Sequence, residues 1–132
     1  MSDRKPVVDH KDLEVWQIAR DLSIKIHRMT LSELPKFEMY ESGSQIRRAS
    51  KSVPFNIVEV YGRKQYKLEF LKHLHYALGS AKETQDEIDC LFETGSLRDE
   101  LLYRELAALV EKLISKLVAF IQGVETNHRT KD

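Results

Sequence analysis

The sequence predicts an all-α protein, folded as an antiparallel, up-down-up-down four-helix bundle in a single domain spanning residues 1–132. Apolar residues recur three or four positions apart along four long segments, which is the period of a helix buried on one face. Glycine (5 residues) and proline (3 residues) are scarce and divide these segments, and no strand pattern competes with them. Because the connections are short, consecutive helices should be antiparallel neighbours.

The first helix is expected from about Leu13 to Met29, with Asp12 as its N-cap. The segment from Leu31 to Phe37 is predicted to be a connection, because Pro35 disfavours helical geometry in the residue before it. The helix should bury one apolar stripe, formed by Val15, Ile18, Ala19, Leu22, Ile26 and Met29.

The second helix should begin at Glu38 or Ser44 and end near Tyr61, with Gly62 as a left-handed cap. Pro54 lies inside this helix. An interior proline removes a backbone hydrogen bond and clashes with the preceding turn, at a cost of about 3 kcal/mol. The sequence therefore predicts a kink or a break at Pro54.

The third helix, about Lys64 to Glu93, and the fourth, about Leu97 to Val124, should be the longest. The ordered core is expected at about residues 11–124, with frayed termini. The fourth helix has the cleanest periodicity in the chain, carried by Leu102, Leu106, Leu109, Leu113, Leu117, Phe120 and Val124.

The charge balance is neutral, since 21 Lys and Arg residues cancel 21 Asp and Glu residues. This argues against a highly basic nucleic-acid binder, although it says nothing about how the charges are distributed. Cys90 is the single cysteine, so no internal disulfide can form. No signal peptide or transmembrane segment is recognisable, and we expect a cytoplasmic protein with no membrane role.

No catalytic, cofactor-binding or metal-binding constellation is recognisable. A di-iron bundle needs Glu-x-x-His motifs on two helices, whereas Glu69 and His73 are four residues apart and have no second copy. The glycines are isolated and form no phosphate-binding loop. We therefore expect a protein that is not an enzyme and uses no cofactor.

The segment from Val53 to Tyr61 is apolar around most of the helix circumference. A helix in a bundle of only four keeps an outward face, so the extra apolar surface suggests an interface between subunits. The alternative is that the kink at Pro54 rotates the buried stripe partway along the helix.

Four stretches carry a resemblance to a known family: Ser44 to Arg63, Lys11 to Ala19, Leu34 to Glu38 and Ala77 to Thr84. Together they resemble, in the expected order, the four-helix-bundle proteins encoded within intervening sequences of bacterial 23S ribosomal RNA genes, also labelled a ribosomal protein family. Two positions depart from the family pattern. Phe55 follows Pro54 and Val60 follows Glu59, and both add apolar bulk.

The resemblance implies a non-enzymatic protein that assembles as a homopentameric ring with a structural or scaffolding role. Related proteins are accessory factors of diversity-generating retroelements, in which a basic ring surface contacts nucleic acid and a reverse transcriptase. The alternative function is therefore binding of RNA or DNA, with a reverse transcriptase or another protein as a possible partner. Neighbouring genes would discriminate between the two roles.

Charge is unevenly distributed along the chain. The segment from Ile46 to Lys72 holds seven basic and two acidic residues, whereas the segment from Glu83 to Glu100 holds seven acidic residues and one basic residue. The candidate nucleic-acid-binding residues are Arg47, Arg48, Lys51, Arg63, Lys64 and Lys67. The candidate interface and signature residues are Gln45, Ser52, Pro54, Phe55, Asn56, Val58, Glu59 and Tyr61.

Purely structural interpretations of these residues stay open. The charges are either ordinary solvated faces or pair with opposite charges on neighbouring subunits. The polar signature residues are equally explained as an interface or as a network that stabilises the kink, because buried polar groups need partners. Arg47 and Arg48 are about 100° apart on a helix, so only one of them readily faces the interior.

Overall fold

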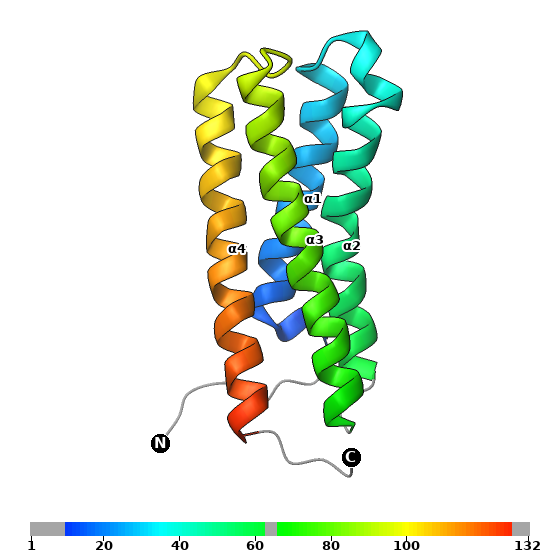
Figure 1. The fold of residues 1–132 in the computed structure, drawn as a ribbon, viewed down its shortest axis with the longest axis vertical. Helices are drawn as coiled ribbons and strands as arrows, with labels where there is room; N and C mark the ends of the chain where they lie inside the picture. The colour runs from blue at the N-terminus through cyan, green and yellow to red at the C-terminus, as the bar shows by residue number, and fades with distance from the viewer. Residues whose placement is uncertain (1–9, 63–65, 128–132) are drawn as a thin grey trace.

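The computed structural model describes residues 10–62 and 66–127, and within these ranges it consists of helices and connections without a strand. The main helices are α1 (Glu14–Ser32), α2 (Ser42–Gly62), α3 (Lys67–Glu93) and α4 (Glu100–Asn127), with short 3-10 helices η1 (His10–Asp12) and η2 (Lys36–Tyr40). In Figure 1 the α1–α2 and α3–α4 connections lie at one end, and consecutive helices run in opposite directions. The predicted all-α, four-helix fold class is confirmed.

The helix order around the bundle follows from the contacts between elements. Helix α1 packs against α2 and α4, and α3 packs against the same two helices. The four helices therefore follow one another around the bundle in chain order. Two consecutive outer sides of the bundle are formed by the pairs α1 with α2 and α2 with α3.

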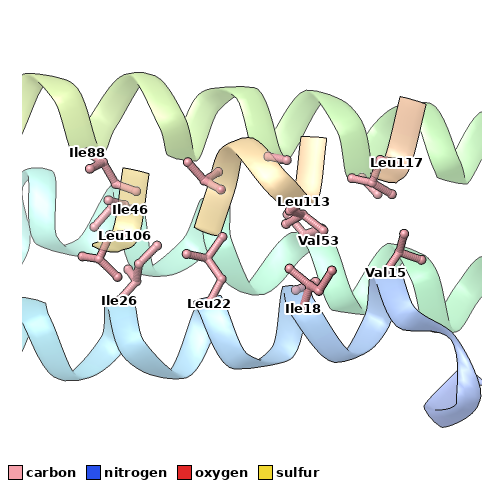
Figure 2. Packing of buried hydrophobic residues seen from close by; sticks show 14 of the residues in the cluster. Val15, Ile18, Leu22, Ile26, Ile46, Val53, Ile88, Leu106, Leu113 and Leu117 are labelled. Carbon is pink, nitrogen blue, oxygen red and sulfur yellow. The ribbon is translucent and has the colours of Figure 1, made fainter. Parts of the chain in front are cut away.

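The larger part of the core is a column of side chains contributed by all four helices, as Figure 2 shows for its labelled residues, and a second cluster contains Phe70, Leu74, Ile121 and Val124. Every residue of the stripe predicted for the first helix is buried. In α4 the buried positions are Leu106, Val110, Leu113, Leu117, Ile121 and Val124, whereas Leu102, Leu109 and Phe120 are only partly buried. The stripe of α4 is thus rotated slightly from the predicted one.

The start of α1 differs from the prediction. The helix begins at Glu14, and Leu13 takes the N-cap position with no capping hydrogen bond from a side chain. Asp12 lies within η1, so the predicted Asp12 cap is wrong. The reason is that the chain turns into a 3-10 helix immediately before α1, which places Asp12 one residue too early.

The start of α2 lies between the two predicted positions, because residues 36–40 form η2 and do not extend the α-helix. A close backbone approach follows η2. A Cβ atom added at Gly43 would lie 2.5 Å from the carbonyl oxygen of Glu38. Glycine is the residue that this approach tolerates.

Helix α2 continues through Pro54 to Gly62, so the break that was one of the two expected outcomes does not occur. The kink stays a prediction. The expected left-handed cap at Gly62 is wrong, since among the described residues the positive φ belongs to Gly95, at 84°. Gly95 follows α3, whose end at Glu93 is as predicted.

Helix α4 begins at Glu100, three residues later than expected. Asp99 accounts for this start, because its Oδ1 accepts a hydrogen bond of 3.0 Å from the backbone N–H of Leu102. That bond satisfies one of the backbone donors that the first turn of a helix leaves unpaired. Leu97, the predicted first residue, is instead fully buried in the core.

Candidate interaction groove between α1 and α2

A groove of about 840 Å³ runs along the outer side of the bundle between α1 and α2. We call it the α1/α2 groove. It is lined by His10, Lys11, Trp16, Arg20, Ser23, Ile24, His27, Arg28, Lys51, Pro54, Phe55 and Val58.

The apolar part of the groove is exposed to solvent. Phe55 is 65% exposed, Val58 39% and Ile24 38%. On α2, Lys51, Phe55 and Val58 are spaced by three or four residues and so share the face that looks towards α1. These exposed apolar side chains on one side of the bundle make the groove a candidate interaction site.

The groove is also cationic. Lys11, Arg20, Arg28 and Lys51 line it, and none of the described lining residues carries a carboxylate. The guanidinium carbon of Arg20 lies 5.7 Å from the centre of the Trp16 ring, a cation–π arrangement. In the part of the chain that the structure describes, neither Arg28 nor Lys51 forms an ion pair.

One wall of the groove contains a buried polar atom. Nδ1 of His27 is inaccessible to solvent and has no hydrogen-bond partner among the described residues. Buried polar atoms in native proteins normally have partners, so this nitrogen is an exception within the described residues.

The opposite flank of α2, which packs against α3, is closed by polar contacts. Ser80 donates a hydrogen bond of 2.9 Å from its hydroxyl to that of Ser52. The side-chain amide of Asn56 donates to the backbone carbonyl of Ser52 at 2.9 Å, and its Oδ1 lies 3.3 Å from Nδ1 of His73. A second hollow of about 390 Å³ lies on this side, lined by Gln45, Arg48, Ala49, Ser52, Ser80 and Glu83.

Those candidate nucleic-acid-binding residues that the structure describes do not lie in one patch. Arg48 lines the hollow towards α3, whereas Lys51 lines the α1/α2 groove. Lys67, at the start of α3, donates to the backbone carbonyl of Glu125 at 3.0 Å. Arg63 and Lys64 lie outside the described residues.

Arg47 has a structural position at the end of the bundle that carries the α1–α2 connection. Its Nη1 donates to the hydroxyl of Thr30 at 2.9 Å, and its Nη2 donates to the backbone carbonyl of Met39 at 2.8 Å. The neighbouring Arg48 is exposed. The two arginines thus separate into one inward and one outward side chain, as their 100° offset on a helix requires.

The candidate interface residues divide between the two flanks of α2. Pro54, Phe55 and Val58 line the α1/α2 groove. Gln45 and Ser52 line the hollow towards α3. Asn56 bonds to Ser52, while Glu59 is exposed and Tyr61 is partly buried. Only the first group lies on an open apolar surface.

Sequence reasoning missed the half of the groove that α1 contributes. The residues missed are Trp16, Arg20, His27 and Arg28. A count of charge within one continuous segment does not find them, because the groove joins two segments. The sequence does contain a signal for this surface. Apolar and basic residues alternate every four positions along a second face of the helix, at Trp16, Arg20, Ile24 and Arg28.

A cluster of carboxylates lies on α3, and we call Glu83, Asp86 and Glu87 the acidic strip. Glu83 and Asp86 are exposed, while Oε2 of Glu87 is buried and without a hydrogen-bond partner among the described residues. Burial, with smaller contributions from the negative charges of Glu83 and Asp86, raises the pKa of Glu87 from 4.5 to about 7. The strip therefore carries charges that repel one another within the monomer.

The residues that the structure describes contain no group of three or more His, Cys, Asp or Glu side chains arranged to hold a metal ion. None of the helices within the same residues is long and apolar enough to cross a membrane.

Comparisons with known proteins agree with the fold. A similar structure is the crystal structure of a protein of unknown function from the S23 ribosomal protein family of Bacteroides thetaiotaomicron, with a TM-score of 0.73 and 21% sequence identity over 82% of this chain and 98% of that chain. At this identity the likeness shows the fold alone. No curated protein matches the sequence.

Residues 11–119 match the family described as 23S rRNA-intervening sequence protein, which confirms the resemblance seen in the sequence. Neither this family description nor that of the similar structure names an enzymatic activity. The match covers most of the chain, including α1, α2, α3 and most of α4. The chain therefore belongs to the 23S rRNA-intervening sequence protein family.

Proposed function

We propose that this chain is a non-enzymatic assembly protein that forms a homo-oligomeric ring, a pentamer, with a structural or scaffolding role. The observation that supports assembly is the exposed apolar surface of the α1/α2 groove, above all Phe55, which is 65% exposed. The number five comes from what the family resemblance implies.

The composition of the groove fits a protein interface. Stable interfaces combine an apolar centre with polar and charged groups at the rim, and bury about 800 Å² on each partner. Phe55, Val58 and Ile24 supply the apolar centre, and arginine and lysine side chains surround it. Aromatic residues and arginine are also the residue types that most often dominate binding energy at interfaces.

Light scattering coupled to size-exclusion chromatography tests the proposal at micromolar concentration. We expect the wild-type protein to elute with a mass near five times the 15.4 kDa of one chain. The double variant Phe55→Ser, Val58→Ser should shift towards the monomer. Leu101→Ser is the matched control, because Leu101 is 82% exposed on α4 and lies outside the groove. A wild-type mass of 15.4 kDa would contradict assembly.

A second candidate function is nucleic-acid binding, as in retroelement accessory proteins, where a reverse transcriptase would be a further partner. It is favoured by the combination of Trp16 and Phe55 with cations and no described carboxylate in the α1/α2 groove. Aromatic rings that stack on bases, set among phosphate-binding charges, are typical of single-strand binding.

Salt titrations with single-stranded and duplex RNA and DNA test the second function. Two triple variants separate the surfaces: Arg20→Gln, Arg28→Gln, Lys51→Gln for the groove, and Arg48→Gln, Arg63→Gln, Lys64→Gln for the basic segment around α2. Each lost phosphate contact should lower the salt slope by about 0.7 to 0.9. Lys82→Gln, on α3, is the control. Absence of binding in 50 mM salt, or equal binding by both triple variants and wild type, would contradict this function.

A further inference from the structure

We infer that the α1/α2 groove of one copy receives the acidic strip of α3 from a second copy, so that assembly uses two different surfaces joined head to tail. The inference rests on the proposed homo-oligomeric function and specifies its contact. The pairs brought together are Arg28 and Lys51 with Glu83 and Asp86, and Phe55 with Tyr76.

Charge complementarity is the first argument. The groove presents cations with no described carboxylate, and the strip presents three carboxylates within two helical turns. Arg28, Lys51, Glu83 and Asp86 form no ion pair within the described residues. Pairing two copies of the groove with each other would place like charges opposite one another, which opposes a symmetric contact between identical surfaces.

The raised pKa of Glu87 supports this assignment independently of the groove. Its carboxylate is destabilised by burial and by Glu83 and Asp86, and its Oε2 has no hydrogen-bond partner among the described residues. A cation brought from outside the monomer would relieve this repulsion.

The heights of the two surfaces along the bundle are the second argument, because a closed ring whose axis runs parallel to the bundle joins surfaces at the same height. The Ser52–Ser80 hydrogen bond of 2.9 Å aligns α2 with α3, and the Arg47–Thr30 hydrogen bond of 2.9 Å aligns α1 with α2. Glu83 lies three residues from Ser80 in the direction of the α1–α2 connection. Counting from these pairs at a rise of about 1.5 Å per residue places Glu83 and Arg28 at heights along the bundle axis that differ by no more than about one helical turn.

The apolar pair lies at a matching height on the other side of the Ser52–Ser80 contact. Phe55 is three residues beyond Ser52, and Tyr76 is four residues before Ser80, so in antiparallel helices both are displaced in the same direction. Tyr76 is 51% exposed. Helical spacing places it on the same face of α3 as Glu83, seven residues away. The strip and Tyr76 together thus offer both the acidic and the aromatic chemistry that the groove fits.

The angle between the two surfaces is the third argument. The groove lies on the side formed by α1 and α2, and Glu83 lines the hollow on the adjacent side formed by α2 and α3. Joining surfaces on adjacent sides rotates each copy by about 90° relative to the last, so that a ring closes after about four or five copies. This is the size range of the proposed pentamer.

A charge-swap experiment tests the inference, again by light scattering at micromolar concentration. The groove variant Arg28→Glu, Lys51→Glu and the strip variant Glu83→Lys, Asp86→Lys should each raise the dissociation constant of the assembly by at least about 10-fold for every pair reversed. The quadruple variant carries all four changes and restores opposite charges across the contact. We expect it to regain the wild-type mass.

The control is Lys112→Glu, a charge reversal at an exposed position of α4 that lines neither the α1/α2 groove nor the hollow beside the acidic strip, which should keep the wild-type mass. Helical circular dichroism verifies that each variant is folded. If the wild type assembles but the strip variant also keeps its mass, or the quadruple variant stays dissociated, the pairing is wrong and the proposed function stands. If the wild type is a monomer, the proposed function itself is contradicted.

Discussion

The two flanks of α2 are built from the same short segment. They differ in whether their side chains are hydrogen-bonded within the monomer or exposed to solvent. Towards α3, Ser52 and Asn56 close the flank with hydrogen bonds to Ser80 and to the Ser52 backbone. Towards α1, Phe55 and Val58 remain exposed beside Lys51, which forms no ion pair within residues 10–62 and 66–127. Ser52 and Asn56 are thus bonded within the monomer, whereas Phe55 and Val58 are left open to solvent. What distinguishes the two flanks is whether their side chains find partners within the same chain.

The largest expected effect is the difference in unfolding free energy between a change on the buried face of α2 and a change on its open flank. Ile57 is fully buried, and Ile57→Ala should lower the free energy of unfolding by about 2–5 kcal/mol, because it leaves a cavity in the core. Phe55→Ala, two residues away, should change it by no more than about 0.5 kcal/mol. Urea denaturation measures both at a concentration where light scattering finds monomer. Equal losses of unfolding free energy in the two variants would contradict the distinction between the buried face and the open flank.

The next effect concerns the adjacent arginines. Arg47→Ala removes charge-assisted hydrogen bonds to Thr30 and to the Met39 carbonyl, and should cost about 1.5–3 kcal/mol of unfolding free energy. Arg48→Ala should stay within about 0.5 kcal/mol, because Arg48 is exposed. Chemical denaturation of both variants is the measurement. A larger loss at Arg48 would show that the inward arginine has been misassigned.

A smaller effect is expected on the closed flank. Asn56→Ala removes the hydrogen bond to the Ser52 carbonyl and the contact with His73, and should lower the unfolding free energy by about 1 kcal/mol. Gln45→Ala, an exposed change on the same flank, is the matched control. The loss in Asn56→Ala should appear without any change in the mass of the assembly. A shift in mass would mean that Asn56 itself takes part in the contact with a neighbouring subunit.

Helical periodicity predicted the elements and their buried stripes because core packing imposes the period directly on the sequence. The stripe of α1 and the end of α3 at Glu93 follow from this. Helix starts were less predictable, because they depend on local hydrogen bonds. Asp99 caps α4 through Leu102, whereas Asp12, an equally good capping residue, lies in a 3-10 helix.

The candidate site was predicted only in part, since a surface joins residues distant in the sequence. Phe55 and Val58 were recognised because they exceed what one buried stripe needs. Counting charge along the chain grouped Arg47, Arg48 and Lys51, which a helix directs to three different surroundings. Arg28 and Arg20 reach the groove only through the packing of α1 against α2, which no window of sequence contains.

The smallest expected effect lies on the acidic strip and depends on pH. Burial raises the pKa of Glu87 to about 7 in the folded protein from 4.5, so between these values the folded state binds the proton more tightly than the unfolded state does. The contribution of Glu87 to stability is therefore most favourable below pH 4.5, falls as the pH rises to about 7, and is constant above that. Glu87→Gln removes this contribution, because glutamine does not titrate.

Urea denaturation of the wild type and of Glu87→Gln between pH 4.5 and 8 measures the difference, in which all other titrating groups cancel. The variant should gain stability relative to the wild type as the pH rises towards 7. The gain should be modest, because Glu87 is only partly buried and solvent screens its charge. Glu111→Gln, the same change at an exposed position of α4, is the control. A difference at Glu87 that does not depend on pH would mean that folding leaves the pKa of its carboxyl unchanged, and the acidic strip would no longer be a set of mutually repelling charges.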